Sequence, residues 1–348
     1  MRFTARAYGR FTVACLAVGV IPAVVFCETA SMAALVVPSR ETLERHDVLV
    51  DGDLPWQRGL RLLQSLWRQD RGLPAGWHPR GGGPSARRLG SRLALPAAED
   101  GLTNYLTDTV REVVRDELAA AAGSGKLYGT PRIYDDLLSS QPLCFNLFGE
   151  LAADLDLATR FARHLWPDRV EQATRVAFEH SPGRDDERYL GNRTAFDVYF
   201  EHTTPEGHRG FIGIEVKYHE RLDTAAAENR GRPTEVARGS GVFTSDALDA
   251  LDEPPLQQLW FDHLLALSML AGDGSQWRGG GLFVLLHPAA NEACYHVAAA
   301  YQRHLRDRRT FQRLTLEEAV AVLRLAGAGS WVDELAGRYL DYQRLRKA

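Results

Sequence analysis

Residues 210–220 read GFIGIEVKYHE, and this run is the most strand-like in the chain. Its side chains alternate in character, so an extended strand would place charged and apolar residues on opposite faces. The charged face carries Glu215 and Lys217, two positions apart. The apolar face, which we expect to anchor the strand in the core, carries Ile212, Ile214 and Val216.

Lysine is scarce in this protein. Lysine and arginine together number 41, but only Lys126, Lys217 and Lys347 are lysines. Arginine keeps its charge at any accessible pH, whereas a desolvated lysine can change its protonation state. The use of lysine rather than arginine at position 217 therefore indicates a chemical role for this residue. An E-x-K pair on a strand is also typical of a solvated ion pair, and that interpretation competes with the chemical one.

A second strand-like segment comes just before the first. Residues 193–201, RTAFDVYFE, alternate in the same way, and a turn-rich connection, HTTPEGHR, follows them. We expect an antiparallel hairpin. Its first strand would place Phe196, Val198 and Phe200 on one face and Asp197 and Tyr199 on the other. If Glu201 pairs with Phe211, Asp197 lies opposite Glu215, whereas a slip of one residue would break this alignment.

Two carboxylates on neighbouring strands would offer oxygen ligands from rigid elements. Mg²⁺ takes one or two carboxylates, keeps waters and accepts phosphate oxygens from a substrate, and Mn²⁺ is an alternative ion. Such a metal activates water and stabilises the transition state of phosphodiester cleavage. Lys217 could orient or deprotonate the attacking water, or neutralise the developing charge. Asp197 and Glu215 are therefore the predicted metal ligands.

This pattern resembles the PD-(D/E)XK nuclease superfamily, in which an acidic residue on one strand precedes [DE]-x-K on the next. Asp197 stands in the position of the first acid, and Glu215-Val216-Lys217 matches E-x-K. The resemblance implies that Glu179 is the helical acid that often lies upstream, although a helix-terminal charge is the simpler interpretation. Asp197 lacks the preceding proline of the family pattern. Gln258, or its neighbour Gln257, is a candidate supporting residue.

The resemblance extends beyond the motif. Segments including SSQPLCFNLFGEL, YLGNRTAFDV and GFIGIEVKYHE are similar to bacterial PD-(D/E)XK proteins described as restriction endonucleases. It covers about residues 100–348 and implies an α/β fold with a mixed central sheet flanked by helices. We expect added N-terminal helices. The predicted domains are an N-terminal extension (1–38), a helical segment with a Gly/Pro/Arg-rich linker (39–100) and the nuclease-like domain (101–348).

The remaining elements follow from hydrophobic periodicity. Helices are expected over 54–68, 101–122, about 140–166, 168–180, 256–272, 291–306 and from Thr315, where Glu318 completes a capping box. In the helix over 168–180, Val170, Ala173 and Ala177 share a face and Glu179 lies in the last turn. Residues 280–288 form a short apolar run that predicts a buried strand.

The composition gives no sign of a strongly basic protein, since the net charge is -4. The four cysteines have no C-x-x-C spacing, which suits a reducing compartment. Residues 11–27 are apolar and follow three arginines, as in a signal peptide. Alternatives are a true start at Met32 or a structural segment. We expect a cytoplasmic protein without a membrane partner, with a secreted or anchored form left open.

The predicted function is Mg²⁺-dependent hydrolysis of DNA by an endonuclease of the restriction or defence type. Arg184, Arg188 and Arg193 flank the site in sequence and are predicted DNA-backbone contacts, with ordinary surface arginines as the alternative. The lack of interleaved aromatic residues favours double-stranded DNA. A catalytically silent nucleic-acid-binding protein and a DNA-repair exonuclease are the alternative functions. A homodimer is left open.

Overall fold

The computed structural model describes residues 36–348, except 81–82, 122, 225–227 and 273–275. Residues Ala34–Ala348 form one compact unit. The predicted signal-like stretch 11–27 and the alternative start at Met32 lie outside the described residues. None of the helices among the residues described has the length and apolar character needed to cross a membrane.

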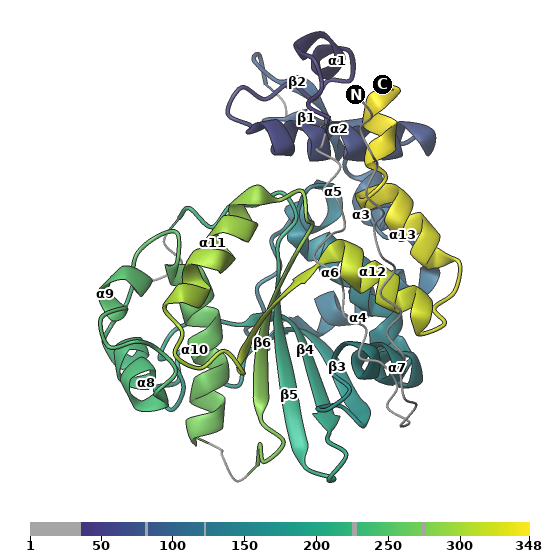
Figure 1. The fold of residues 1–348 in the computed structure, drawn as a ribbon. Helices are drawn as coiled ribbons and strands as arrows, with labels where there is room; N and C mark the ends of the chain where they lie inside the picture. Colours follow the sequence, from purple (N-terminus) through teal and green to yellow (C-terminus); the bar gives the residue numbers. More distant parts are fainter. Residues whose placement is uncertain (1–35, 81–82, 122, 225–227, 273–275) are drawn as a thin grey trace, which may run out of the picture. The chain divides into compact units, whose positions relative to one another are not determined.

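A five-stranded mixed sheet forms the centre of the fold, in the order β3-β4-β5-β6-β7 (Figure 1). Strands β3, β4 and β5 pair antiparallel, and β5, β6 and β7 pair parallel. The strands are β3 (Gln172–His180), β4 (Phe196–Thr203), β5 (Arg209–Val216), β6 (Gly281–His287) and β7 (Phe311–Thr315). The quoted strand β5 is therefore central, and both of its faces are buried.

Helices cover the two faces of the sheet. One core lies beneath Ile212, Ile214 and Val216. The helices that contribute to that core include α6 (Ser140–Ala153), α7 (Leu155–Leu165), α12 (Leu316–Leu325) and α13 (Trp331–Tyr339). A second core includes Phe211 and Phe283 on the opposite face. Its helices are α8 (Arg232–Ser240), α9 (Leu248–Leu251), α10 (Gln257–Gly272) and α11 (Glu292–Arg303). The predicted mixed sheet flanked by helices is confirmed.

The N-terminal elements precede this sheet in the chain. They are α1 (Arg40–Arg45), α2 (Pro55–Asp70), β1 (Ala75–His78), β2 (Arg87–Leu93), α3 (Ala97–Asp100), α4 (Asp108–Ala121) and α5 (Arg132–Asp135). A short 3-10 helix, η1 (Tyr342–Arg346), packs against α2 near the end of the chain. The prediction of a Gly/Pro/Arg-rich linker within residues 39–100 is wrong in part, because β1 and β2 pair there as an antiparallel two-stranded sheet. Packing of β2 on α2, which local sequence does not show, orders this segment.

Two of the predicted helices were wrong. Residues 172–180 form strand β3 rather than the end of a helix over 168–180. The segment holds β-branched Thr174 and Val176, and its backbone pairs along β4, so sheet pairing outweighs the weak helical spacing of the alanines. The long helix expected up to Trp166 is two helices. They separate at Asp154, whose side chain accepts the N–H groups of Asp156 and Leu157 and starts α7 afresh.

Other local predictions hold. Thr315 and Glu318 form the expected capping box at the start of α12. Strand β6 is buried along its whole length, as the apolar run over 280–288 predicted. Strand β7 was not predicted, since its five residues carry little periodic signal. Cys144 and Cys294 are free, buried thiols.

Candidate active site

The β4–β5 hairpin has the predicted register, since Glu201 pairs with Phe211. The ladder ends at Val198 and Ile214, and one step further places Asp197 opposite Glu215. Here Asp197 Oδ2 accepts a hydrogen bond from the Val216 N–H at 2.8 Å. The carboxylate therefore occupies the place that a backbone carbonyl of β4 would take if the ladder continued.

The prediction that Phe196 shares a face with Val198 and Phe200 is wrong. Phe196 lies in the core of the opposite face with Tyr199, whereas Val198 and Phe200 lie in the first core. Its ring covers Gly213 so closely that a Cβ at that position would overlap it. Phe196 therefore does not continue the alternation of Val198 and Phe200.

Glu215 and Lys217 are buried rather than solvated, at 5% and 8% exposure. Lys217 Nζ lies 2.7 Å from Glu215 Oε1, and Gln258 Nε2 on α10 donates to the same oxygen at 2.7 Å. The structure therefore brings together four of the predicted residues, Asp197, Glu215, Lys217 and Gln258. A simple surface ion pair does not describe this arrangement, because a helix covers it.

The charges of the site act strongly on one another. Burial, followed by the nearby charge of Glu215, raises the pKa of Asp197 well above its usual value. Burial alone would lower the pKa of Lys217, but the carboxylates of Glu215, Asp197 and Glu220 outweigh it and raise that pKa. Without a metal the site therefore holds Lys217 as a cation, beside an Asp197 carboxyl group that resists ionisation.

Asp262 is a further carboxylate that the sequence reasoning did not select. It follows Gln258 by four residues on α10, so the two share one face of the helix. Asp262 is 5% exposed, and its Oδ2 is buried without a hydrogen-bond partner among the described residues. Burial, followed by the charge of Glu215, raises its pKa well above the usual value. An acidic residue within the apolar run of α10 was the signal that could have identified it.

Glu220, the last residue of the opening stretch, fixes the segment that follows Lys217. Its carboxylate accepts the N–H of Ser140 at the start of α6 at 2.8 Å and that of Tyr218 at 3.0 Å. Burial alone would raise the pKa of Glu220, yet Lys217 and these N–H groups hold it below its usual value. Glu220 thus connects the E-x-K strand to helix α6.

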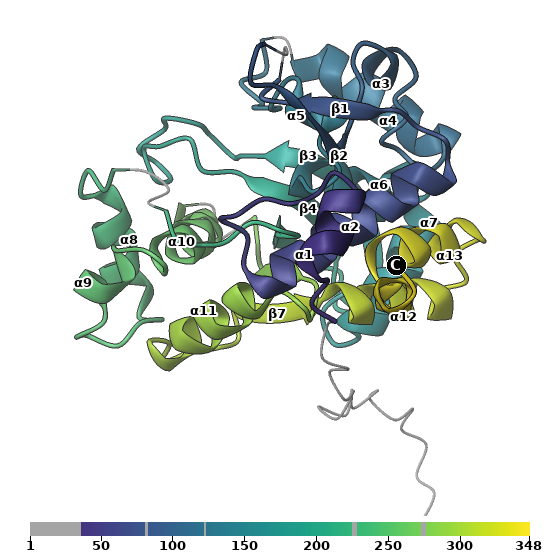
Figure 2. The ribbon, with the colours of Figure 1, turned by 90° about the horizontal axis from the view of Figure 1, so that it is seen from above.

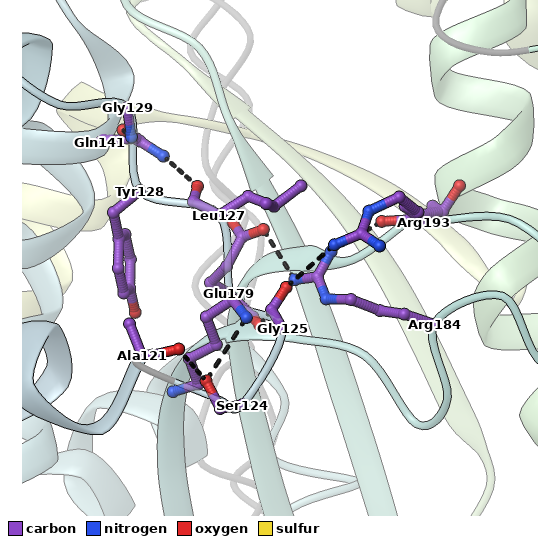
Figure 3. A network of polar contacts seen from close by, with 12 residues as sticks. Ala121, Ser124, Gly125, Leu127, Tyr128, Gly129, Gln141, Glu179, Arg184 and Arg193 are labelled. Atoms are coloured by element: carbon purple, nitrogen blue, oxygen red, sulfur yellow. Dashed lines mark hydrogen bonds and ion pairs between the residues drawn. The ribbon is translucent and has the colours of Figure 1, made fainter.

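Glu179 lies on strand β3 instead of a helix, one residue before the pair His180–Phe196. Its backbone has a φ of 48°, a left-handed conformation that is uncommon for a residue with a side chain. Arg184 Nη2 lies 2.8 Å from Glu179 Oε1, and Figure 3 shows the arginine turned inward onto it. Burial raises the pKa of Glu179, and Arg184 opposes that shift.

The three predicted DNA-contact arginines lie on the β3–β4 connection but differ in exposure. Only 10% of the Arg184 side chain is exposed, because it spans Glu179 and the Arg193 carbonyl. The Arg188 side chain is 79% exposed and pairs with Asp186 at 2.6 Å. Arg193 is half-exposed, and its Nη1 lies 3.0 Å from Asp185 Oδ2. Arg188 and Arg193 are thus the two whose side chains reach solvent.

The residues at the strand ends fit a divalent cation of the hard, oxygen-seeking kind. Among residues 36–348 as described, no three His, Cys, Asp or Glu side chains are grouped to hold a metal by themselves. Mg²⁺ does not require such a group, since it commonly binds through one or two carboxylates, waters and substrate phosphate. Asp197 and Glu215 supply two carboxylates. Asp262 on α10, whose Oδ2 has no hydrogen-bond partner among the described residues, is close enough for their charges to act on it.

Comparison with known proteins identifies a family for this chain. The model of the family described as PD-(D/E)XK nuclease superfamily matches residues 51–341, which is most of the chain. No curated protein and no solved structure matches significantly. The match begins within the N-terminal elements, ahead of α2, and includes the whole sheet.

Proposed function

Because the chain belongs to the PD-(D/E)XK nuclease superfamily, we propose that it is a metal-dependent endonuclease that hydrolyses phosphodiester bonds in double-stranded DNA. The observation that carries the proposal is the buried group of Asp197, Glu215 and Lys217 at the end of the β4–β5 hairpin. The sequence resemblance of residues 139–220 favours a role in restriction or defence, and the cysteine pattern favours the cytoplasm.

In this proposal Asp197 and Glu215 hold the cation, with Mg²⁺ preferred and Mn²⁺ as an alternative. When bound, such an ion supplies Lewis acidity and a nucleophilic water at neutral pH. The chain's own residues do the positioning. Gln258 fixes Glu215 through its 2.7 Å hydrogen bond, and the Val216 N–H fixes Asp197.

Lys217 has the role of a fixed cation beside the scissile phosphate. Its ammonium group is a compact donor of three hydrogen bonds, and burial under α10 limits competition from water. Negative charge grows on the non-bridging phosphate oxygens during cleavage, so a preorganised cation stabilises the transition state more than the ground state. The same group can orient the attacking water. Glu220 holds the strand beyond Lys217 in place through Ser140 and Tyr218.

The test is cleavage of supercoiled plasmid and linear duplex DNA in Mg²⁺, in Mn²⁺ and in EDTA. We expect metal-dependent cutting by the wild type and a loss of about 100-fold or more for Lys217→Ala and Asp197→Asn. Arg209→Ala is the matched control, because Arg209 is ion-paired with Glu201 at the opposite end of β5. Circular dichroism checks that each variant folds. Cutting that is unaffected by both site variants would refute the assignment.

A further inference from the structure

The β1–β2 hairpin concentrates positive charge in a chain whose net charge is negative. Residues 71–98 contain five arginines and no acidic residue, whereas the whole chain has a net charge of -4. Arg80 is neutralised by Asp135 and Asp136. Arg87 and Arg88 are both exposed, and neither forms an ion pair within the described part of the chain. These two guanidinium charges are therefore available to a partner.

An aromatic platform lies beside these charges. Trp77 and Arg88 face each other across the two strands, and the guanidinium stacks over the indole ring at 4.1 Å. Trp77 is 43% exposed, which makes it one of the most exposed large apolar residues described. Stacking holds the guanidinium plane and leaves N–H groups at its edge for a phosphate. Burial and the charges of Arg92 and Arg87 lower the pKa of the neighbouring His78, consistent with a positive local potential.

The base of the hairpin is fixed to helix α2. Arg68 Nε donates to the Gly90 carbonyl at 2.9 Å, and Arg61 Nη1 donates to Ser91 Oγ at 2.9 Å. Gly90 itself donates to the Asp47 carbonyl at 2.8 Å. A Cβ at Gly90 would overlap the His46 carbonyl and Ser65, so the close approach requires glycine there. The hairpin is thus held at a defined place on α2.

The same helix contacts the segment that directly follows β5 and contains Lys217. Gln57 Nε2 donates to the His219 carbonyl at 2.9 Å, and Gln64 Nε2 donates to the Tyr218 hydroxyl at 3.0 Å. Figure 1 shows α2 and the β1–β2 hairpin together beyond one end of the sheet, and Figure 2 views the molecule from that side. From Gln57 to Arg68 the helix rises about 16 Å. That distance corresponds to about five base pairs of duplex DNA.

We propose that the exposed side chains of the β1–β2 hairpin, Trp77, Arg87 and Arg88, bind the backbone of duplex DNA beside the active site. The inference rests on the proposed function for the identity of the substrate. A two-stranded ribbon fits the major groove of B-form DNA, and arginines at its edges then reach the flanking phosphates. The major groove of A-form RNA is too narrow for side chains to read, so the geometry favours DNA.

The experiment measures the fluorescence anisotropy of a labelled duplex of about thirty base pairs, longer than the span above. It is done in EDTA, so that no cleavage occurs. The double variant Arg87→Ala with Arg88→Ala is compared with Arg278→Ala with Arg308→Ala. The control removes two exposed arginines just before β6 and β7, at the opposite end of the sheet from Lys217. Both doubles remove equal charge, and the positions in both are solvent-exposed.

We expect the hairpin variant to bind at least about tenfold more weakly and the slope of log affinity against log salt to fall by about two. The control variant should bind within about twofold of the wild type. Equal losses in both doubles, wild-type affinity in the hairpin variant, or no measurable binding by the wild type would each overturn the inference. So would an equal loss on an RNA duplex of the same sequence.

Cleavage in Mg²⁺ and Mn²⁺ separates this inference from the proposed function. A wild type that binds DNA through the hairpin but does not cut it supports the hairpin site and refutes the nuclease assignment. A wild type that cuts DNA while the hairpin variant binds and cuts equally well supports the nuclease assignment and refutes the hairpin site.

Discussion

Replacing Lys217 with methionine removes a buried cation and keeps a side chain of similar length. Lys217 Nζ lies 2.7 Å from Glu215 Oε1, and both side chains are at most one-tenth exposed. Removing one partner of a buried ion pair leaves an uncompensated charge and costs about 3–5 kcal/mol of stability. The free energy of unfolding in EDTA, measured with urea, should fall by that amount.

The same change should separate metal binding from catalysis. Lys217 competes with a cation for Glu215 Oε1, so its removal should let Mg²⁺ stabilise the folded protein at least as much as in the wild type. At Mg²⁺ concentrations about 100-fold above Kd that stabilisation is about 2.7 kcal/mol. Plasmid cleavage should nevertheless fall about 100-fold or more, because the cation beside the phosphate is gone.

Arg209→Ala is the control for this pair of measurements. It removes a half-exposed cation from the other end of β5, so its cost in stability should be at most about 1 kcal/mol. The reasoning is refuted if Lys217→Met unfolds at the urea concentration of the wild type. It is equally refuted if the variant folds, binds Mg²⁺ and cuts DNA at the wild-type rate.

Three further changes test the surroundings of the site. Gln258→Ala should lower kcat about tenfold without unfolding the protein, because Glu215 loses its orienting hydrogen bond; cleavage kinetics with unchanged circular dichroism check this. Burial, and then the nearby charge of Glu215, disfavour an ionised Asp262, so Asp262→Asn should raise the free energy of unfolding in EDTA by about 1 kcal/mol; destabilisation in urea would contradict this. Burial lowers the pKa of His263 to about 3, below its value of about 6.5 in the unfolded chain. The neutral His263 therefore contributes fully to the free energy of unfolding above about pH 6.5, and this contribution is lost as the pH falls. Stability should therefore fall by about 2 kcal/mol between pH 7.5 and pH 5 because of this group. His263→Gln should show a correspondingly smaller fall in urea unfolding at the two pH values.

Local sequence pattern was sufficient to predict the structure at the centre of this protein. The alternation in residues 210–217 and the short connection before them predicted the hairpin, its register and the approach of Asp197 to Glu215. These features are readable because neighbouring strands in a hairpin are close in sequence, and a buried face specifies the register strongly. The capping box at Thr315 was readable for the same reason, since all its contacts lie within three residues.

Contacts between segments far apart in the sequence determined the features that local pattern could not predict. Glu179 lies on a strand because β3 pairs along β4, and a nine-residue segment with alanines at helical spacing does not reveal that partner. Gln258 was only a weak candidate and Asp262 was missed, because α10 follows β5 after a long connection. Burial of the Glu215–Lys217 pair likewise depends on that helix. Tertiary packing therefore turned a charged pair on a strand into an enclosed group of carboxylates around one lysine.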